Sequence, residues 1–236
     1  MQQTCQLLQE KTQGLDAQGI VNEVVAHFGN KIALATSFGA EDQVLTDMVC
    51  KAGGEAQLFT LDTGRIHQET YDVLAATEKH YDRKIEVMFP KTDDVQDMVN
   101  TKGINLFRES VENRKICCGV RKMEPLRRKL GTLDAWLVGL RQAQSVTRTA
   151  LESVEIDENN GLIKVSPLAQ WSEEDVWDYI KANNLPYNAL HDKGFPSIGC
   201  DSCTRAIEKG EDVRAGRWWW EAPEHKECGL HNRPTK

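Results

Sequence analysis

The chain has 236 residues, and its 36 Asp and Glu outnumber its 29 Lys and Arg, which gives a formal net charge of −7. This balance argues against a nucleic-acid-binding protein that relies on a broad basic face. The length suits one large domain, or one domain with an appendage. The N-terminus has no basic segment followed by an apolar run, and no apolar run is long enough to span a bilayer. We therefore expect a cytoplasmic protein with no membrane partner.

Short apolar runs alternate with helical patterns along much of the chain. This alternation predicts an α/β fold with a mostly parallel, twisted sheet and helices on both faces. Strands are predicted at 31–37, 56–61, 85–89, 135–140 and 162–165, and helices at 43–51, 66–80, 93–101 and 173–183. The expected regions are a helical segment at 1–30, a nucleotide-binding core at 31–166, a C-terminal region at 167–224 and a mobile tail at 225–236.

Polar turns follow three of the predicted strands. Ser37 and Gly39 come after the first, Asp62 to Arg65 after the second, and Arg141 to Ser145 after the fourth. In a parallel sheet these turns lie at the same edge, where free amide N–H groups and helix dipoles favour anions. The first turn alone could be an ordinary strand–helix connection. Together, the three turns predict a nucleotide-sized pocket.

Four of the seven cysteines form two tight groups. Cys117 and Cys118 are adjacent, and Cys200 and Cys203 form a Cys-x-x-Cys pair. A cytoplasmic chain rarely carries a disulfide framework, so these thiols predict a metal site. Structural zinc and an iron–sulfur cluster both accept four thiolates, and the adjacent pair favours the cluster. Two unrelated buried pairs are the third alternative.

Basic residues are also clustered, despite the acidic balance. Arg121 and Lys122 follow the adjacent cysteines, whereas Arg214 and Arg217 follow the Cys-x-x-Cys pair and would share one face of a helix. A metal site that joins the two cysteine segments would bring these cations together. Arginine binds phosphate and sulfate through two parallel hydrogen bonds, so a small polyanionic ligand is expected. The basic run at 127–129 is interpreted as a solvated helix face.

The last cysteine lies close to the C-terminus. Cys228 follows Lys226 by two residues and precedes His231 by three. Neighbouring cations favour the thiolate, which is the nucleophilic form of cysteine. The alternative is a solvated tail whose cysteine has no role.

Seven motifs lie between residues 31 and 231. They are Ser37-Phe-Gly-Ala-Glu41, Leu61-Asp-Thr-Gly64, Cys117-Cys118-x-x-Arg121-Lys122, Gly139-Leu-Arg-x-x-Gln-Ser145, Ile198-Gly-Cys-x-x-Cys-Thr204, Gly216-Arg-Trp-Trp-Trp220 and Glu227-Cys-Gly-Leu-His231. Together they resemble the assimilatory adenylyl-sulfate reductases, the members of the phosphoadenylyl-sulfate reductase family that carry iron–sulfur cysteines. Relatives that use 3′-phosphoadenylyl sulfate generally lack the four paired cysteines, so this resemblance implies adenylyl sulfate as the substrate.

This resemblance implies a PP-loop fold, similar to the adenine-nucleotide alpha-hydrolases, with a C-terminal segment folded over the active site. It implies that Cys228 attacks the sulfur of adenylyl sulfate, releases AMP and becomes an S-sulfocysteine. Thioredoxin, as a transient reductant, would then free sulfite for cysteine biosynthesis. A 4Fe-4S cluster is the implied cofactor.

The resemblance also assigns roles to individual residues. The catalytic set is Cys228, Lys122, Arg214, Arg217 and His231. The substrate-binding set is Ser37, Gly39, Ala40, Glu41, Leu61, Thr63, Gly139 and Arg148. The cluster ligands are Cys117, Cys118, Cys200 and Cys203.

Several other interpretations stay open at this point. A 3′-phosphoadenylyl-sulfate reductase or a dual-specificity enzyme would share most of the motifs. A non-catalytic iron–sulfur sensor would leave Cys228 unexplained, and an ATP-using PP-loop enzyme would need an SGGxDS loop in place of Ser37 to Asp42. The aromatic run at 218–220 could shape the substrate cleft or form the interface of a homo-oligomer.

Overall fold

The computed structural model describes residues 1–144 and 151–222. The chain forms two compact units. The first comprises residues 1–60, 72–86 and 130–188, and the second comprises residues 61–71, 87–129 and the chain from residue 189.

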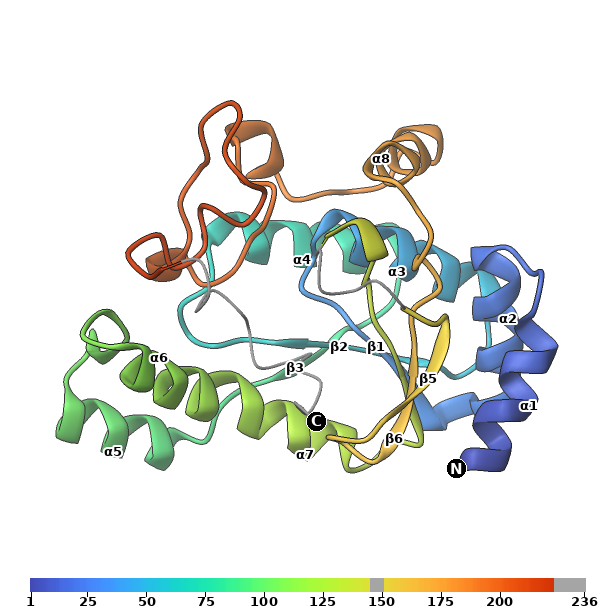
Figure 1. The fold of residues 1–236 in the computed structure, drawn as a ribbon, viewed down its shortest axis with the longest axis horizontal. Coiled ribbons are helices and arrows are strands. Elements are labelled where there is room, and N and C mark those ends of the chain that lie inside the picture. Colours follow the sequence, from blue (N-terminus) through green and yellow to red (C-terminus); the bar gives the residue numbers. More distant parts are fainter. Residues whose placement is uncertain (145–150, 223–236) are drawn as a thin grey trace. The chain divides into compact units, whose positions relative to one another are not determined.

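A six-stranded sheet is the main β structure, with the strand order β3-β2-β1-β4-β6-β5 (Figure 1). β1 pairs in parallel with both β2 and β4, and β4 pairs in parallel with β6. The mostly parallel α/β sheet predicted from the sequence is therefore confirmed. The strands are β1 (Ile32–Ala35), β2 (Gln57–Leu61), β3 (Glu86–Met88), β4 (Ala135–Leu137), β5 (Val154–Asp157) and β6 (Leu162–Val165).

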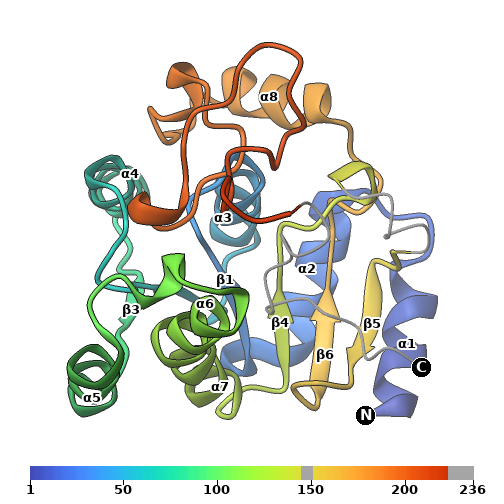
Figure 2. The ribbon, with the colours of Figure 1, turned by 60° about the vertical axis from the view of Figure 1, so that its left-hand side comes forward.

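The sequence analysis missed β5, which pairs antiparallel with β6 at one edge of the sheet (Figure 2). A tight turn joins the two strands. In this turn the Asp157 carboxylate accepts a hydrogen bond from the Asn160 side chain at 2.8 Å, and Gly161 has a φ of 70°. An Asn-Asn-Gly turn between two alternating or apolar runs is a recognisable hairpin signal.

Eight α-helices lie in the described ranges. The first thirty residues form two helices, because Gly14 takes a φ of 78° and the Asp16 carboxylate caps the second helix by accepting from the Gly19 N–H at 2.7 Å. No helix in the described ranges is both long and apolar enough to cross a membrane. The helices are α1 (Gln2–Thr12), α2 (Ala17–Phe28), α3 (Ala40–Ala52), α4 (Gln68–Tyr81), α5 (Thr92–Lys102), α6 (Val111–Cys118), α7 (Glu124–Leu130) and α8 (Glu173–Ala182).

Each unit has its own apolar core. In the first unit, fully buried side chains from α2, α3, β1 and β4 pack together, among them Val24, Leu34, Val44 and Leu137. Burial of each such side chain stabilises the fold by roughly 1.5–3 kcal/mol. The core of the second unit is smaller and contains Met98, Leu106, Phe107 and Trp218 together with Cys117 and Cys203.

The basic run of α7 corrects one sequence prediction. Arg127 and Arg128 are exposed as expected, but Lys129 is buried, with only 6% of its surface exposed. Its neighbour Leu130 and Leu126, three residues earlier, are also buried. Residues three apart share a helix face, so Lys129 falls on the apolar side of the helix.

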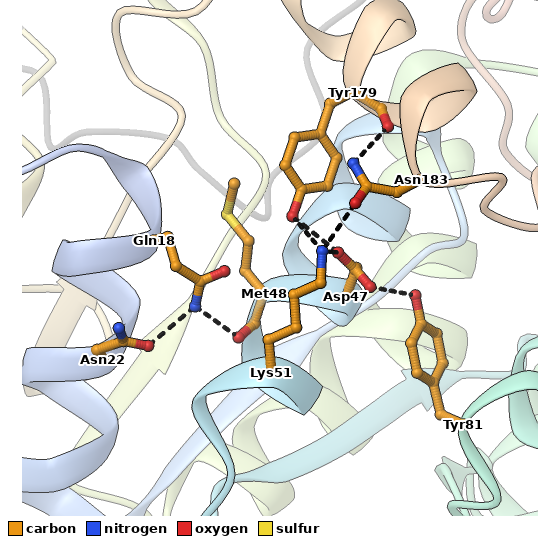
Figure 3. Close-up of polar contacts among 8 residues, drawn as sticks. All are labelled: Gln18, Asn22, Asp47, Met48, Lys51, Tyr81, Tyr179 and Asn183. Atoms are coloured by element: carbon orange, nitrogen blue, oxygen red, sulfur yellow. Dashed lines mark hydrogen bonds and ion pairs between the residues drawn. The ribbon is translucent and has the colours of Figure 1, made fainter.

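A buried carboxylate joins three helices of the first unit (Figure 3). Asp47 of α3 accepts hydrogen bonds from the hydroxyls of Tyr179 on α8 at 2.7 Å and Tyr81 on α4 at 3.1 Å. Lys51 lies 2.6 Å from the same carboxylate and also donates to Asn183 at 2.9 Å. Burial raises the pKa of both tyrosines, and the negative charge of Asp47 raises it further. Their hydroxyls therefore stay protonated and continue to donate hydrogen bonds.

Replacement of Asp47 by Ala is expected to lower the free energy of unfolding by about 2–4 kcal/mol, because two half-buried hydroxyls lose their acceptor and the Lys51 ammonium loses its ionic partner. Urea unfolding measures the change. Asp178→Ala is the matched control, because Asp178 forms an exposed pair with Lys181 at 4.0 Å, and its loss should change stability by less than about 0.5 kcal/mol. Equal effects of the two substitutions would contradict the prediction.

Candidate functional site

Two turns of the first unit meet at the carboxyl edge of the sheet. β1 has β2 on one side and β4 on the other, so the turns that follow β1 and β4 lie at the same edge of the sheet. Gly139, after β4, lies against the first turn of α3. A Cβ atom on Gly139 would be 2.5 Å from Asp42 Oδ1 and 2.9 Å from Glu41 Cβ, so only glycine fits here. Arg141 completes the contact by donating to Glu41 Oε1 at 2.8 Å.

The turn after β1 is organised by an internal carboxylate. The Ser37 backbone N–H and hydroxyl donate to Asp42 Oδ2 at 2.6 and 2.8 Å. Phe38, the next residue in this turn, is fully buried. Its backbone has a φ of 60°, a conformation that residues other than glycine rarely adopt. Burial raises the pKa of Asp42 to about 6, although the hydrogen bonds from Ser37 oppose the shift.

The Asp42 carboxylate lies where the sequence predicted that an anionic ligand would bind. The start of α3 favours negative charge, and Asp42 supplies one from within the chain. Both Ser37 donors are already engaged by this carboxylate, and an ionised Asp42 would repel a pyrophosphate placed beside it. The first unit thus brings together five of the predicted substrate residues, namely Ser37, Gly39, Ala40, Glu41 and Gly139.

The second unit contains a cavity lined by all four paired cysteines. Three of them, Cys117, Cys200 and Cys203, are close enough to influence one another electrostatically. Guanidinium and ammonium groups surround them. The residues that line this cysteine cavity are Arg65, Phe107, Arg114, Cys117, Cys118, Arg121, Lys122, Cys200, Ser202, Cys203, Arg217 and Trp218.

Two local structures present the thiols. Cys117 and Cys118 end α6, and a π-helical turn, Gly119–Met123, follows directly. Such turns are rare and occur often at functional sites. Cys203 closes a short 3₁₀ turn, Asp201–Cys203, which begins directly after Cys200.

The Leu61-Asp-Thr-Gly turn holds the Cys-x-x-Cys segment in place. Ile66 forms an isolated antiparallel bridge with Cys200, and the Asp201 N–H donates to the Arg65 carbonyl at 2.8 Å. Thr63 Oγ1 lies 3.2 Å from Cys200 Sγ. Thr63, a predicted substrate-binding residue, therefore contacts a cysteine of the cavity, and with Leu61 it belongs to the second unit.

Arg121 crosses from the π-helical turn to the same loop. Its Nη1 donates to the Thr63 carbonyl at 2.7 Å, and only 8% of the residue is exposed. Gly64 has a φ of 70°, and a Cβ atom there would lie 3.3 Å from Arg121 Nη1. A carbonyl satisfies the donor without neutralising the guanidinium, so the positive charge of Arg121 remains beside the cysteines.

Two of the cavity thiols, Cys117 and Cys203, are buried, whereas Cys118 and Cys200 are half-buried. Burial raises the pKa of Cys117 and raises that of Cys203 to about 11, with a further contribution from Cys200. A bound metal would reverse this effect, because a coordinating thiol loses its proton. Among the residues that the structure describes, no three His, Cys, Asp or Glu side chains are arranged to hold a metal ion. The donor set itself, four thiols around one cavity, matches in number and type what a four-thiolate centre requires.

The predicted catalytic cations of the second unit differ in their surroundings. Lys122 is half-buried and lines the cavity. Arg217 is buried, donates to the Ile198 carbonyl at 3.3 Å and packs so closely on Gly199 that a Cβ there would meet its guanidinium at 2.4–2.9 Å. Arg214 is half-buried in a series of turns, so the helix that would align it with Arg217 does not form.

Sequence analysis missed two cations of the cavity, Arg65 and Arg114. Arg114 precedes Cys117 by one helical turn, so a predicted helix at 111–118 would have placed it on the same face. Arg65 directly follows the Leu61-to-Gly64 motif, and nothing in its residue type distinguishes it from a solvated arginine. Three predicted site residues, Arg148, Cys228 and His231, lie outside the described residues.

Comparison with solved structures defines the class of fold. Yeast FAD synthetase in complex with FAD superposes with a TM-score of 0.56 at 14% identity, over 86% of this chain and 67% of that one. Phosphoadenylyl-sulfate reductase from Candida auris, solved as a phosphate complex, reaches a TM-score of 0.74 at 28% identity and covers 88% of this chain and 98% of that one. The fold is that of the PP-loop nucleotide-binding enzymes.

Sequence comparison is more specific. Residues 31–206 match the phosphoadenosine phosphosulfate reductase domain. Adenosine 5'-phosphosulfate reductase from Allochromatium vinosum is 52% identical over 86% of this chain and 80% of its own length, and the enzyme of the same name from Burkholderia cepacia is 50% identical over 86% and 81%. The chain therefore belongs to the phosphoadenosine phosphosulfate reductase family.

The raised pKa of Asp42 predicts a pH-dependent stability. Folding shifts this pKa from 3.8 to about 6, so the folded chain holds the proton more tightly, and this stabilisation is lost as the pH rises through 6. Relative to Asp42→Asn, the wild-type free energy of unfolding should fall by up to about 3 kcal/mol between pH 4 and pH 7. Urea titrations of both proteins across this range measure the difference. Parallel pH profiles would contradict the assignment.

Proposed function

We propose that this chain reduces adenylyl sulfate to sulfite and AMP in cytoplasmic sulfate assimilation, with thioredoxin as the electron donor. One observation carries the proposal: the second unit gathers four thiols and several cations around one cavity, in a chain about half identical to adenosine 5'-phosphosulfate reductases. Cations that can bind a small dianion lie beside four thiols in one unit. This combination suits sulfate reduction better than simple nucleotide binding.

In the first step, the Cys228 thiolate attacks the sulfur atom of adenylyl sulfate. A bond forms between Sγ and this sulfur, and the bond from sulfur to the bridging phosphate oxygen breaks. The electron pair of the broken bond stays on that oxygen, which leaves as part of AMP. Cys228 then carries a sulfonate group as S-sulfocysteine.

In the second step, a thioredoxin thiolate attacks Sγ of Cys228 and forms a mixed disulfide, and sulfite leaves with the electron pair of the S–S bond. The second thioredoxin thiol closes the thioredoxin disulfide and frees Cys228 as a thiolate. Thioredoxin supplies the two electrons that convert the sulfate sulfur to sulfite.

The remaining assigned residues bind and neutralise the substrate. Lys122, Arg214, Arg217 and His231 are proposed to surround the phosphosulfate, because charge builds up on the phosphate oxygen as AMP leaves. Support comes from Lys122 and Arg217, which line the cysteine cavity of the second unit. The nucleotide-binding set is Ser37, Gly39, Ala40, Glu41, Leu61, Thr63, Gly139 and Arg148.

A 4Fe-4S cluster is proposed on Cys117, Cys118, Cys200 and Cys203. Support comes from the four thiols around one cavity and from the absence of disulfides among the described cysteines. When bound, the cluster would supply a rigid, charged centre that holds the two cysteine segments together. Thr63 and Arg121 would restrain those segments from the loop side, through the contacts to Cys200 and to the Thr63 carbonyl.

Replacement of Cys203 by Ser should remove iron and the absorbance near 400 nm from the purified protein, because one of the four thiolates is lost. Iron and sulfide analysis measures the loss. Cys50→Ser is the control, since Cys50 is a half-buried thiol at the edge of the first unit's core and should leave the iron content unchanged. A colourless wild-type protein with stoichiometric zinc would refute the cluster.

Cys228→Ser should abolish sulfite production from adenylyl sulfate and reduced thioredoxin, while iron content and absorbance stay at the wild-type level. The hydroxyl is a far weaker nucleophile than a thiolate at neutral pH. Sulfite release and AMP release are measured together. Sulfite production by the variant would show that another group is the nucleophile.

The same assay separates the alternatives. The ratio of kcat/KM for adenylyl sulfate and 3′-phosphoadenylyl sulfate distinguishes a selective enzyme from a dual-specificity one. A fully loaded wild-type protein that forms sulfite from neither substrate would favour the iron–sulfur sensor.

A further inference from the structure

A buried ion pair lies next to the cysteine cavity of the second unit. Arg114 of α6 donates to both carboxylate oxygens of Glu221, from Nε at 3.0 Å and from Nη2 at 2.8 Å. The side chains are only 2% and 4% exposed. Arg205 and Glu211 of the same unit also form two hydrogen bonds, from Nη1 and Nη2, but there the side chains are 36% and 32% exposed.

Glu221 ends a short segment that is attached to both cysteine-bearing segments. Arg217 forms an isolated bridge with Thr204, directly after the Cys-x-x-Cys pair. The Trp218 N–H donates to the Cys203 carbonyl at 3.0 Å, and the Glu221 N–H donates to the Trp218 carbonyl at 2.8 Å. The ion pair then connects this segment to the helix that carries Cys117 and Cys118.

The Trp218 ring strengthens this attachment. The guanidinium carbons of Arg114 and Arg217 lie 4.5 and 4.8 Å from the ring centroid, so Trp218 contacts two cations. Its backbone has a φ of 41°, which is costly for a large side chain. The chain therefore holds Trp218 in an unfavourable backbone conformation and buries a charge pair beside it. A segment that merely led to a solvated terminus would need neither.

We propose that Arg114 and Glu221 are positioning residues that fix the starting point of the segment carrying Cys228. Glu221 precedes Cys228 by seven residues, which span at most roughly 25 Å. A fixed starting point limits the volume that the thiol can sample and raises its effective concentration at the substrate. This inference depends on the proposed function, because it assigns the pair to the step in which Cys228 attacks adenylyl sulfate.

Separate measurement of the two half-reactions tests the proposal. Glu221→Gln should slow single-turnover S-sulfocysteine formation, followed by the intact mass of the protein, by about tenfold to a hundredfold. Sulfite release from the preformed adduct by reduced thioredoxin should keep its wild-type rate, because that step occurs between two molecules. Arg114→Lys keeps the charge but loses the second hydrogen bond, so a smaller decrease in the first step is expected.

Glu211→Gln is the matched control and should leave both half-reactions at the wild-type rate, because it weakens a similar pair away from the cysteine segments. Iron content and melting temperature are recorded for every variant. First-step rates of Glu221→Gln and Arg114→Lys equal to the control would overturn the proposal. An equal decrease in both steps, or loss of iron or of folded protein in both variants, would also overturn it, by showing a purely structural contact.

Measurements on the wild-type protein distinguish failure of this inference from failure of the proposed function. Absence of any S-sulfocysteine in iron-loaded wild-type protein would refute the reductase activity, and the positioning role with it. Normal adduct formation in the wild type, combined with an unaffected Glu221→Gln variant, would refute the positioning role alone.

Discussion

Parallel pairing of β1 with β4 determines the organisation of the first unit. It brings the turn after β1 and the turn after β4 to one edge of the sheet, although about a hundred residues separate them in the chain. At this edge, Gly139 lets the backbone approach Asp42 closely, and Arg141 binds Glu41. The hydrogen bonds from Ser37 to Asp42 then hold the first turn in shape. Each of these contacts depends on the strand order.

The second unit concentrates positive charge around buried sulfur. Arg121 and Arg217 donate to the backbone carbonyls of Thr63 and Ile198, which accept a hydrogen bond from each guanidinium but do not neutralise its charge. Arg114 differs, because the Glu221 carboxylate does neutralise it. The charges of Arg121 and Arg217 therefore remain available to attract an anionic ligand. The charge of Arg114 instead forms the ion pair that attaches Glu221 to α6.

Much of the sheet could be predicted from the sequence, because buried parallel strands appear as short apolar runs between turn residues. β5 was missed because an edge strand with two charged residues, Glu155 and Asp157, has no such run. The α6 helix was missed for a similar reason, since Val111 to Cys118 is mostly polar and is stabilised by the Ser110 cap and by tertiary packing. Lys129 was predicted to be exposed but is buried, because the charge of a side chain does not show which face of the helix is buried.

The sequence by itself determined the family, the α/β class and the residue types of the site, because motif spacing and apolar periodicity are local properties of the chain. Tertiary structure alone decided which groups meet. The contact of Thr63 with Cys200, the carbonyl partner of Arg121 and the pairing of Arg114 with Glu221 each join residues between 58 and 137 positions apart. Such contacts depend on packing in the second unit, including that around Trp218, and this packing is set by the burial of apolar surface across the whole unit.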